Sequence, residues 1–66
     1  MIFRVEHAFT AQGEGEISLI KGETVTLDEG ADNDEDWVFI TNKQGQSGYC
    51  PKSFLVPTNG EIKNGK

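Results

Sequence analysis

Cysteine, proline and long apolar runs are scarce in this chain of 66 residues, and each shortage argues against a class of protein. The single cysteine, Cys50, cannot form an internal disulfide, so nothing indicates an oxidising compartment. No run approaches the roughly 18 apolar residues that span a bilayer. The first residues also lack the apolar segment of a signal peptide. We therefore expect one small cytoplasmic domain from a longer protein.

Basic residues are scarce too, since six lysines and arginines face eleven aspartates and glutamates and leave a net charge of −5. Phosphate groups are bound by Lys and Arg, so this charge argues against nucleic acid and against direct binding to an anionic membrane. It suits a basic partner, because complementary charge speeds encounter and sets specificity. A net charge of this size also serves plain solubility, and composition alone leaves both explanations open.

Short apolar stretches of strand type are what the chain does contain. They lie at 3–6, 17–19, 24–28, 37–41, 48–50 and 55–56. Glycine-rich or acidic segments separate them, and no segment sustains a 3.6-residue repeat, so we predict a small all-β barrel or sandwich. The side chains expected to point inward are Phe3, Val5, Ile17, Leu19, Val25, Leu27, Ile40, Cys50 and Leu55. Residues 1–57 are expected to form the domain, and the polar residues 58–66 a flexible tail or linker.

Catalysis and metal binding find little support in the sequence. Cys50 and His7 are a thiol and a base, but no helix N-terminus is predicted beside the cysteine to activate it. One Cys and one His do not make a structural zinc site. The acidic run at 32–36 lacks the glycine and the terminal glutamate of a calcium loop. We expect no enzyme, no metal and no cofactor.

Aromatic and acidic residues carry the functional signal. Trp37 alternates with Val38 and Ile40 and cannot share their inward face, so it is either exposed or a separate core anchor. A large exposed aromatic beside acids favours a binding surface. The aromatic candidates are His7, Phe9, Trp37, Tyr49 and Phe54, with Pro51 beside the last two. Such side chains suit a polyproline II ligand, which loses little entropy on docking.

Acidic side chains lie in the two segments that flank these aromatics. They are Glu14, Glu16, Asp34, Glu35 and Asp36. Two interpretations stay open, because such acids either hold a ligand Arg or Lys or simply solvate a loop. Exposed ion pairs contribute only about 0.2–1 kcal/mol each, so the acids would set ligand orientation and choice more than affinity.

Three segments in this order resemble the Src-homology-3 (SH3) family, over about 3–56. "VEHAFTAQGEGEISLIKGE" is similar to the family's first aromatic motif, its RT loop and the glycine turn that follows. "EDWVFI" is similar to the segment with the groove tryptophan, and "GYCPKSFLV" to the proline-containing ending. The resemblance implies a five-stranded, partly open barrel with long RT and n-Src loops, which binds proline-rich peptides.

Carried over by position, the resemblance assigns roles to the candidate residues. Phe9 and Phe54 would form the first proline pocket, with His7 beside it. The second pocket and the specificity region would use Trp37, Tyr49 and Pro51. The acids of the RT loop would be Glu14 and Glu16, and those at or beside the n-Src loop Asp34, Glu35 and Asp36. Ser53 stands where the family often has asparagine.

Departures from the family pattern bear on affinity. His7, Phe9 and Phe54 stand at tyrosine positions, and Ser53 replaces an amide donor. Stacking area is largely kept, but each lost hydrogen bond costs about 0.5–1.5 kcal/mol. We therefore expect a weak or unusual binder of proline-rich segments with Arg or Lys.

The expected setting is a monomeric module within a larger signalling, cytoskeletal or endocytic adaptor. Two other functions remain open beside the binding of proline-rich segments. The alternative is an atypical SH3 domain that uses Phe39, Trp37 and the acids for a folded partner or for a segment without the PxxP pattern. A third possibility is a reader of methylated lysine, because an aromatic cage beside acids holds a quaternary ammonium.

Overall fold

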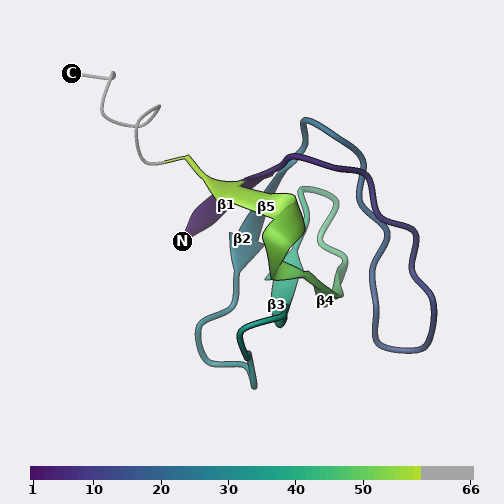
Figure 1. The fold of residues 1–66 in the computed structure, drawn as a ribbon. Helices are drawn as coiled ribbons and strands as arrows, with labels where there is room; N and C mark the ends of the chain where they lie inside the picture. The colour runs from purple at the N-terminus through teal and green to yellow at the C-terminus, as the bar shows by residue number, and fades with distance from the viewer. Residues whose placement is uncertain (59–66) are drawn as a thin grey trace.

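The computed structural model describes residues 1–58, in which five short strands form one antiparallel sheet (Figure 1). The strands are β1 (Ile2–Val5), β2 (Thr24–Leu27), β3 (Trp37–Thr41), β4 (Ser47–Pro51) and β5 (Leu55–Pro57), and the 3₁₀ helix η1 (Lys52–Phe54) joins β4 to β5. The strand order is β4-β3-β2-β1-β5. The predicted all-β, partly open barrel with five strands is confirmed, whereas η1 was not expected from the sequence.

Burial along the strands follows the two-residue repeat of the sequence. In β3, Val38 and Ile40 are buried, while Trp37 and Phe39 belong to the opposite face. In β4, Cys50 is buried and the residues on either side of it are partly covered. Each strand therefore contributes one face to the core and leaves the other at the surface.

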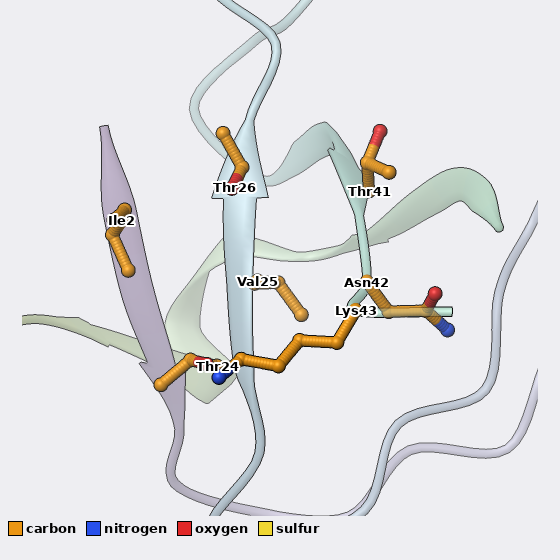
Figure 2. Close-up of a pocket in the computed structure, with 7 residues that line it drawn as sticks. All are labelled: Ile2, Thr24, Val25, Thr26, Thr41, Asn42 and Lys43. Atoms are coloured by element: carbon orange, nitrogen blue, oxygen red, sulfur yellow. The ribbon is translucent and has the colours of Figure 1, made fainter. Parts of the chain in front are cut away.

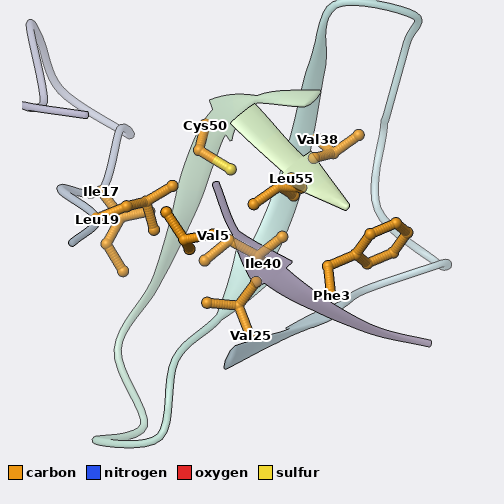
Figure 3. Close-up of a cluster of buried hydrophobic side chains, with 9 residues drawn as sticks. All are labelled: Phe3, Val5, Ile17, Leu19, Val25, Val38, Ile40, Cys50 and Leu55. Carbon is orange, nitrogen blue, oxygen red and sulfur yellow. The ribbon is translucent and has the colours of Figure 1, made fainter. Parts of the chain in front are cut away.

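The core is a single cluster of side chains from all five strands and from the loop between β1 and β2 (Figure 3). Eight of the nine residues predicted to point inward are buried in it. Leu27 is the exception, since it ends β2 and packs against the cluster while only partly covered. Val38 takes the remaining place, because it shares the inward face of Ile40 and is 3% exposed.

The connection from β1 to β2, residues 6–23, is called the RT loop here. It is a long loop that folds back on itself beside the sheet (Figure 1). Its two legs are joined where Phe9 and Leu19 exchange main-chain hydrogen bonds of 3.0 and 2.7 Å. The apolar repeat at 17–19 thus does not form a strand of the sheet. It buries Ile17 and Leu19 under the loop instead.

The two ends of the described chain lie together. β1 pairs with β5 through Phe3 opposite Pro57 and Val5 opposite Leu55. The buried Thr58 extends this contact, since its amide and its hydroxyl both donate to the carbonyl of Ile2, at 3.3 and 3.2 Å. Thr58 is the first residue of the predicted tail, and residues 59–66 lie outside the described residues.

Candidate functional site

The register between β3 and β4 brings the exposed aromatics and the proline onto one surface. Trp37 lies opposite Pro51, and Phe39 lies opposite Tyr49. The Phe39 and Tyr49 rings meet edge to face, with centroids 5.0 Å apart. Trp37 is 36% exposed, so it is not a core anchor. This surface is fixed by backbone pairing, which makes its layout a property of the sheet.

Three further rings continue the surface from Trp37. Phe9 contacts Trp37 at 6.0 Å and Phe54 at 5.9 Å between centroids, and His7 contacts Phe54 at 5.7 Å. All three contacts are edge to face, the arrangement that aromatic pairs favour. We call the unbroken row of His7, Phe54, Phe9 and Trp37 the aromatic row.

Main-chain contacts from distant segments hold the aromatic row together. The bridge to Leu19 fixes Phe9 on the RT loop. Phe54 ends η1, and its carbonyl accepts a 2.7 Å hydrogen bond from the amide of Glu6, which precedes His7. Pro51 is half-buried as the last residue of β4, and Ser53 is exposed within η1. The sequence placed these residues in separate segments, and the structure brings them together.

The two predicted acids of the RT loop differ in their surroundings. Glu14 is exposed near the tip of the loop. Glu16 is half-buried, and its Oε1 accepts a 2.6 Å hydrogen bond from the amide of Gln12. Glu16 also bridges to Tyr49 on β4, whose amide donates to the carbonyl of Gly15 at 2.7 Å. The carboxylate of Glu16 therefore stabilises its own loop, while Glu14 faces solvent.

The three acids predicted as site residues between β2 and β3 also differ in their surroundings. They lie in residues 28–36, the n-Src loop, and all three are exposed. The Oδ1 atom of Asp34 accepts hydrogen bonds of 2.8 Å from the amides of Asp36 and Trp37. The bond from Trp37, followed by that from Asp36, holds the pKa of Asp34 below its ordinary value. Glu35 and Asp36 use no side-chain oxygen in this way among the hydrogen bonds of the described residues.

Two residues next to the site were not among the predicted site residues. Phe39 is the ring partner of Tyr49, and its position on the face of Trp37 was the signal for it. Asn33 accepts from the amide of Phe39 at 2.8 Å and donates to the carbonyl of Asp28 at 2.9 Å. No pattern in the sequence marked Asn33, because the contact depends on how the n-Src loop folds back on β3.

A hollow of about 190 Å³ lies elsewhere, among residues of β1, β2 and the end of β3 (Figure 2). Its lining is mostly hydroxyl, amide and aliphatic, from Ile2, Thr24, Val25, Thr26, Thr41, Asn42 and Lys43. Small-molecule sites are usually about 300–1,000 Å³. None of the predicted site residues lines the hollow. The aromatic row, where four rings from three segments meet, remains the candidate site.

Reactive and metal-binding groups do not converge within residues 1–58. Cys50 is fully buried, and burial raises its pKa to about 11, which disfavours the thiolate that a nucleophile requires. In the described part of the chain, no group of three or more His, Cys, Asp or Glu side chains is placed to hold a metal ion. The same part contains no helix that is long and apolar enough to cross a membrane.

Comparisons with known proteins match this architecture. The family model described as variant SH3 domain matches residues 5–56. The SH3 domain-containing protein Dlish of Drosophila melanogaster is 36% identical over 55 residues, which are 83% of this chain and 15% of that protein. Cdc42-interacting protein 4 of Mus musculus is 38% identical over 50 residues, 76% of this chain and 8% of that protein. The chain thus spans less than a sixth of either relative.

Solved structures agree at the level of the fold. The yeast Pin3 SH3 domain superimposes with a TM-score of 0.77 at 23% identity, covering 86% of this chain and 96% of that one. The second SH3 domain of yeast Bzz1 gives a TM-score of 0.71 at 28% identity, covering 85% of this chain and all of that one.

Proposed function

This chain belongs to the SH3 family, and we propose that it binds proline-rich segments that carry Arg or Lys, as a cytoplasmic module of a larger adaptor. SH3 domains are non-catalytic interaction modules, and the SH2/SH3 adapter protein dreadlocks of Drosophila melanogaster is 32% identical over 53 residues. The finer statement, that this particular surface takes a basic PxxP segment, is the proposal.

The aromatic row is the observation that carries this proposal. The four rings form a continuous aromatic surface, and Pro51, which lies opposite Trp37 on β4, adds an apolar side chain next to it. A polyproline II helix presents its prolines at regular spacing and is already stiff, so it loses little entropy on such a surface. A row of rings held by the sheet and the RT loop therefore suits an extended ligand.

Acidic residues around the aromatic row give the ligand its charge preference. We assign contact with the ligand's Arg or Lys to Glu14 on one side and to Glu35 and Asp36 on the other, since these carboxylates are exposed. Glu16 already bonds the main chain of its own loop. Exposed pairs are weak, so the acids orient the ligand more than they hold it.

Missing hydroxyls set the expected affinity. The aromatic row contains no tyrosine, because Phe9, Phe54 and His7 stand at positions that the family fills with tyrosine. Ring contact is kept, while ligand carbonyls lose hydrogen-bond donors worth about 0.5–1.5 kcal/mol each. We expect binding that is weaker than a tyrosine-lined groove would give.

A peptide titration tests the proposed function. A fluorescein-labelled peptide with a PxxP core and one flanking arginine is titrated against the wild type and Trp37→Ala, with chemical shifts followed on labelled protein. We expect shifts along the aromatic row and loss of binding in Trp37→Ala. Ile2→Ala is the control, because Ile2 is exposed in the hollow away from this surface. Binding that survives Trp37→Ala, or no binding by the wild type, contradicts the proposal.

A folded partner is the second candidate, and the Phe39–Tyr49 pair favours it. These two rings extend the apolar surface beyond Trp37 to where the n-Src loop bends over, with the Tyr49 hydroxyl donating to the carbonyl of Asp32 at 3.2 Å. Competition separates the two candidates, since a proline-rich peptide should not displace a folded partner that is held through Phe39. A methyl-lysine peptide in the same titration tests the aromatic-cage alternative.

A further inference from the structure

The main-chain groups of Trp37 that face away from β4 lie beyond the end of β2. Polar groups of successive strand residues point to alternate sides, so Trp37 and Phe39 point to the same side. The carbonyl of Phe39 accepts a 2.9 Å bond from Asp28, the residue that follows β2. Trp37 comes two residues earlier on β3, where β2 no longer runs. Without another partner, its amide and carbonyl would form an open strand edge.

The n-Src loop supplies the missing partners through Asp34. The amide of Asp34 donates to the carbonyl of Trp37 at 2.9 Å, and its Oδ1 accepts from the amide of Trp37 at 2.8 Å. Both polar main-chain groups of Trp37 are thus paired with a single residue. The side-chain oxygen of Asn33 likewise accepts a hydrogen bond from the amide of Phe39. Two adjacent side chains therefore extend the hydrogen-bond ladder past the end of β2.

We propose that Asp34 is a positioning residue for Trp37 and that its carboxylate is not a contact for the ligand's Arg or Lys. The inference rests on the proposed function, since Trp37 is the residue whose orientation the peptide surface needs. Oδ1 of Asp34 is turned to the amides of Trp37 and Asp36. The lowered pKa of Asp34 agrees with a carboxylate that is stabilised by these two amides.

A positioning role and a ligand-contact role make opposite demands on the side chain. Accepting the two amide hydrogens needs an oxygen in this place, and asparagine offers one of the same size without charge. Attracting a ligand arginine needs the negative charge. Asp34→Asn therefore keeps the first role and removes the second, whereas Asp34→Ala removes both.

The binding arm uses the labelled PxxP peptide with one flanking arginine at two salt concentrations. We expect Asp34→Asn to bind within about twofold of the wild type and Asp34→Ala about two- to tenfold more weakly, the range of one hydrogen bond. Glu35→Gln and Asp36→Asn are the matched controls that remove a charge. Their loss of peptide affinity relative to the wild type should be smaller at high salt. A salt-dependent loss in Asp34→Asn, equal to that of Asp36→Asn, would overturn the proposal.

A second arm needs no ligand and so separates this inference from the proposed function. Hydrogen exchange and the chemical shift of the Trp37 amide are measured in the free protein. We expect faster exchange and a displaced shift in Asp34→Ala, with both restored towards the wild type in Asp34→Asn. If the wild type binds no peptide, the proposed function fails while this arm still reports on Asp34. An unchanged Trp37 amide in Asp34→Ala overturns the positioning role.

Discussion

At the scale of single residues, the same chemical group has different uses according to its neighbours. Glu14 and Glu16 are two positions apart, yet one faces solvent and the other accepts from a loop amide. Cys50 is adjacent to Pro51, yet its thiol is fully buried while the proline lies at the surface of the site. Local hydrogen bonds and burial, more than residue type, decide which side chains are open to a ligand.

The thiol of Cys50 makes the free energy of unfolding depend on pH in the alkaline range. Its pKa is raised from 9.0 to about 11 by burial, so the folded state keeps a proton that the unfolded state loses earlier. The stabilising effect is fully present below pH 9 and is lost between the two values as pH rises. We expect the urea midpoint of the wild type to decrease as the pH rises from 9.0 to about 11. In Cys50→Ala, the decrease caused by the thiol should be absent.

Thiol labelling tests the burial of Cys50, on which the predicted pH dependence rests. In native conditions at neutral pH, Cys50 should react with a disulfide reagent only when the protein unfolds, because its side chain has no exposed surface. The reaction rate should therefore rise with urea in step with unfolding. Rapid labelling of the folded protein contradicts the buried position.

At the scale of elements, the RT loop is closed onto β4 at one glycine. Gly48 is buried, and a Cβ built on it would lie 2.9 Å from Cβ of Ile17 and 3.1 Å from the carbonyl oxygen of Gly15. Next to it, the amide of Tyr49 donates to that carbonyl, and the amide of Ile17 donates back to Tyr49 at 3.1 Å. Loop and strand meet here backbone to backbone.

Gly48→Ala should therefore displace the RT loop. A methyl group has no space against the main chain of residues 15 and 16, so we expect a loss of about 1–3 kcal/mol, typical of overpacking. Gly13→Ala is the matched control, because a Cβ there meets nothing within 4 Å. Urea unfolding gives the stability, and the Tyr49 amide shift gives the displacement. Equal stabilities of the two variants would contradict the close contact.

The strands and the inward set could be predicted from the sequence because both depend on a repeat of two along the chain. Ile40 and Cys50 follow from that repeat alone. Leu27 packs against the core from the expected face but is only partly covered, because it is the last residue of its strand. Asn33 could not be found at all, since it pairs with Phe39, six residues away, only after the n-Src loop has folded back.

The site shows the same division between local and non-local information. The aromatic residues and the two acidic loops were visible as residue types and family positions. The sequence did not show which of these acids accept a hydrogen bond from a main-chain amide, because that depends on the local geometry of the loop. The distinction between Glu14 and Glu16 rests on one 2.6 Å contact that no spacing rule contains.

At the scale of the whole molecule, one small core supports the entire domain. Within residues 1–58, nine buried apolar residues form it, and Ile40 is among the largest of those that are fully buried. Small domains bury a smaller share of their chain surface, so each core side chain carries a large part of the net stability.

Ile40→Ala should destabilise the domain strongly and lower its melting temperature. Truncating a buried isoleucine costs about 2–5 kcal/mol, against a total of about 5–15 kcal/mol for ordinary domains. Ile20→Ala serves as control, since Ile20 is 68% exposed and should change stability by less than about 0.5 kcal/mol. Thermal melting followed by circular dichroism distinguishes the two variants. A melting point for Ile40→Ala close to that of Ile20→Ala contradicts a single shared core.

The pairing of β1 with β5 has a mechanical consequence for a longer polypeptide. Because the strands are antiparallel and Ile2 lies beside Thr58, tension applied at these two points pulls apart neighbouring ends of one ladder. The hydrogen bonds would then be loaded one after another, as in unzipping, instead of together in shear. A module attached in this way yields at low force, so under tension β1 and β5 would separate, and the domain would release its ligand, before a neighbouring domain loaded in shear unfolded.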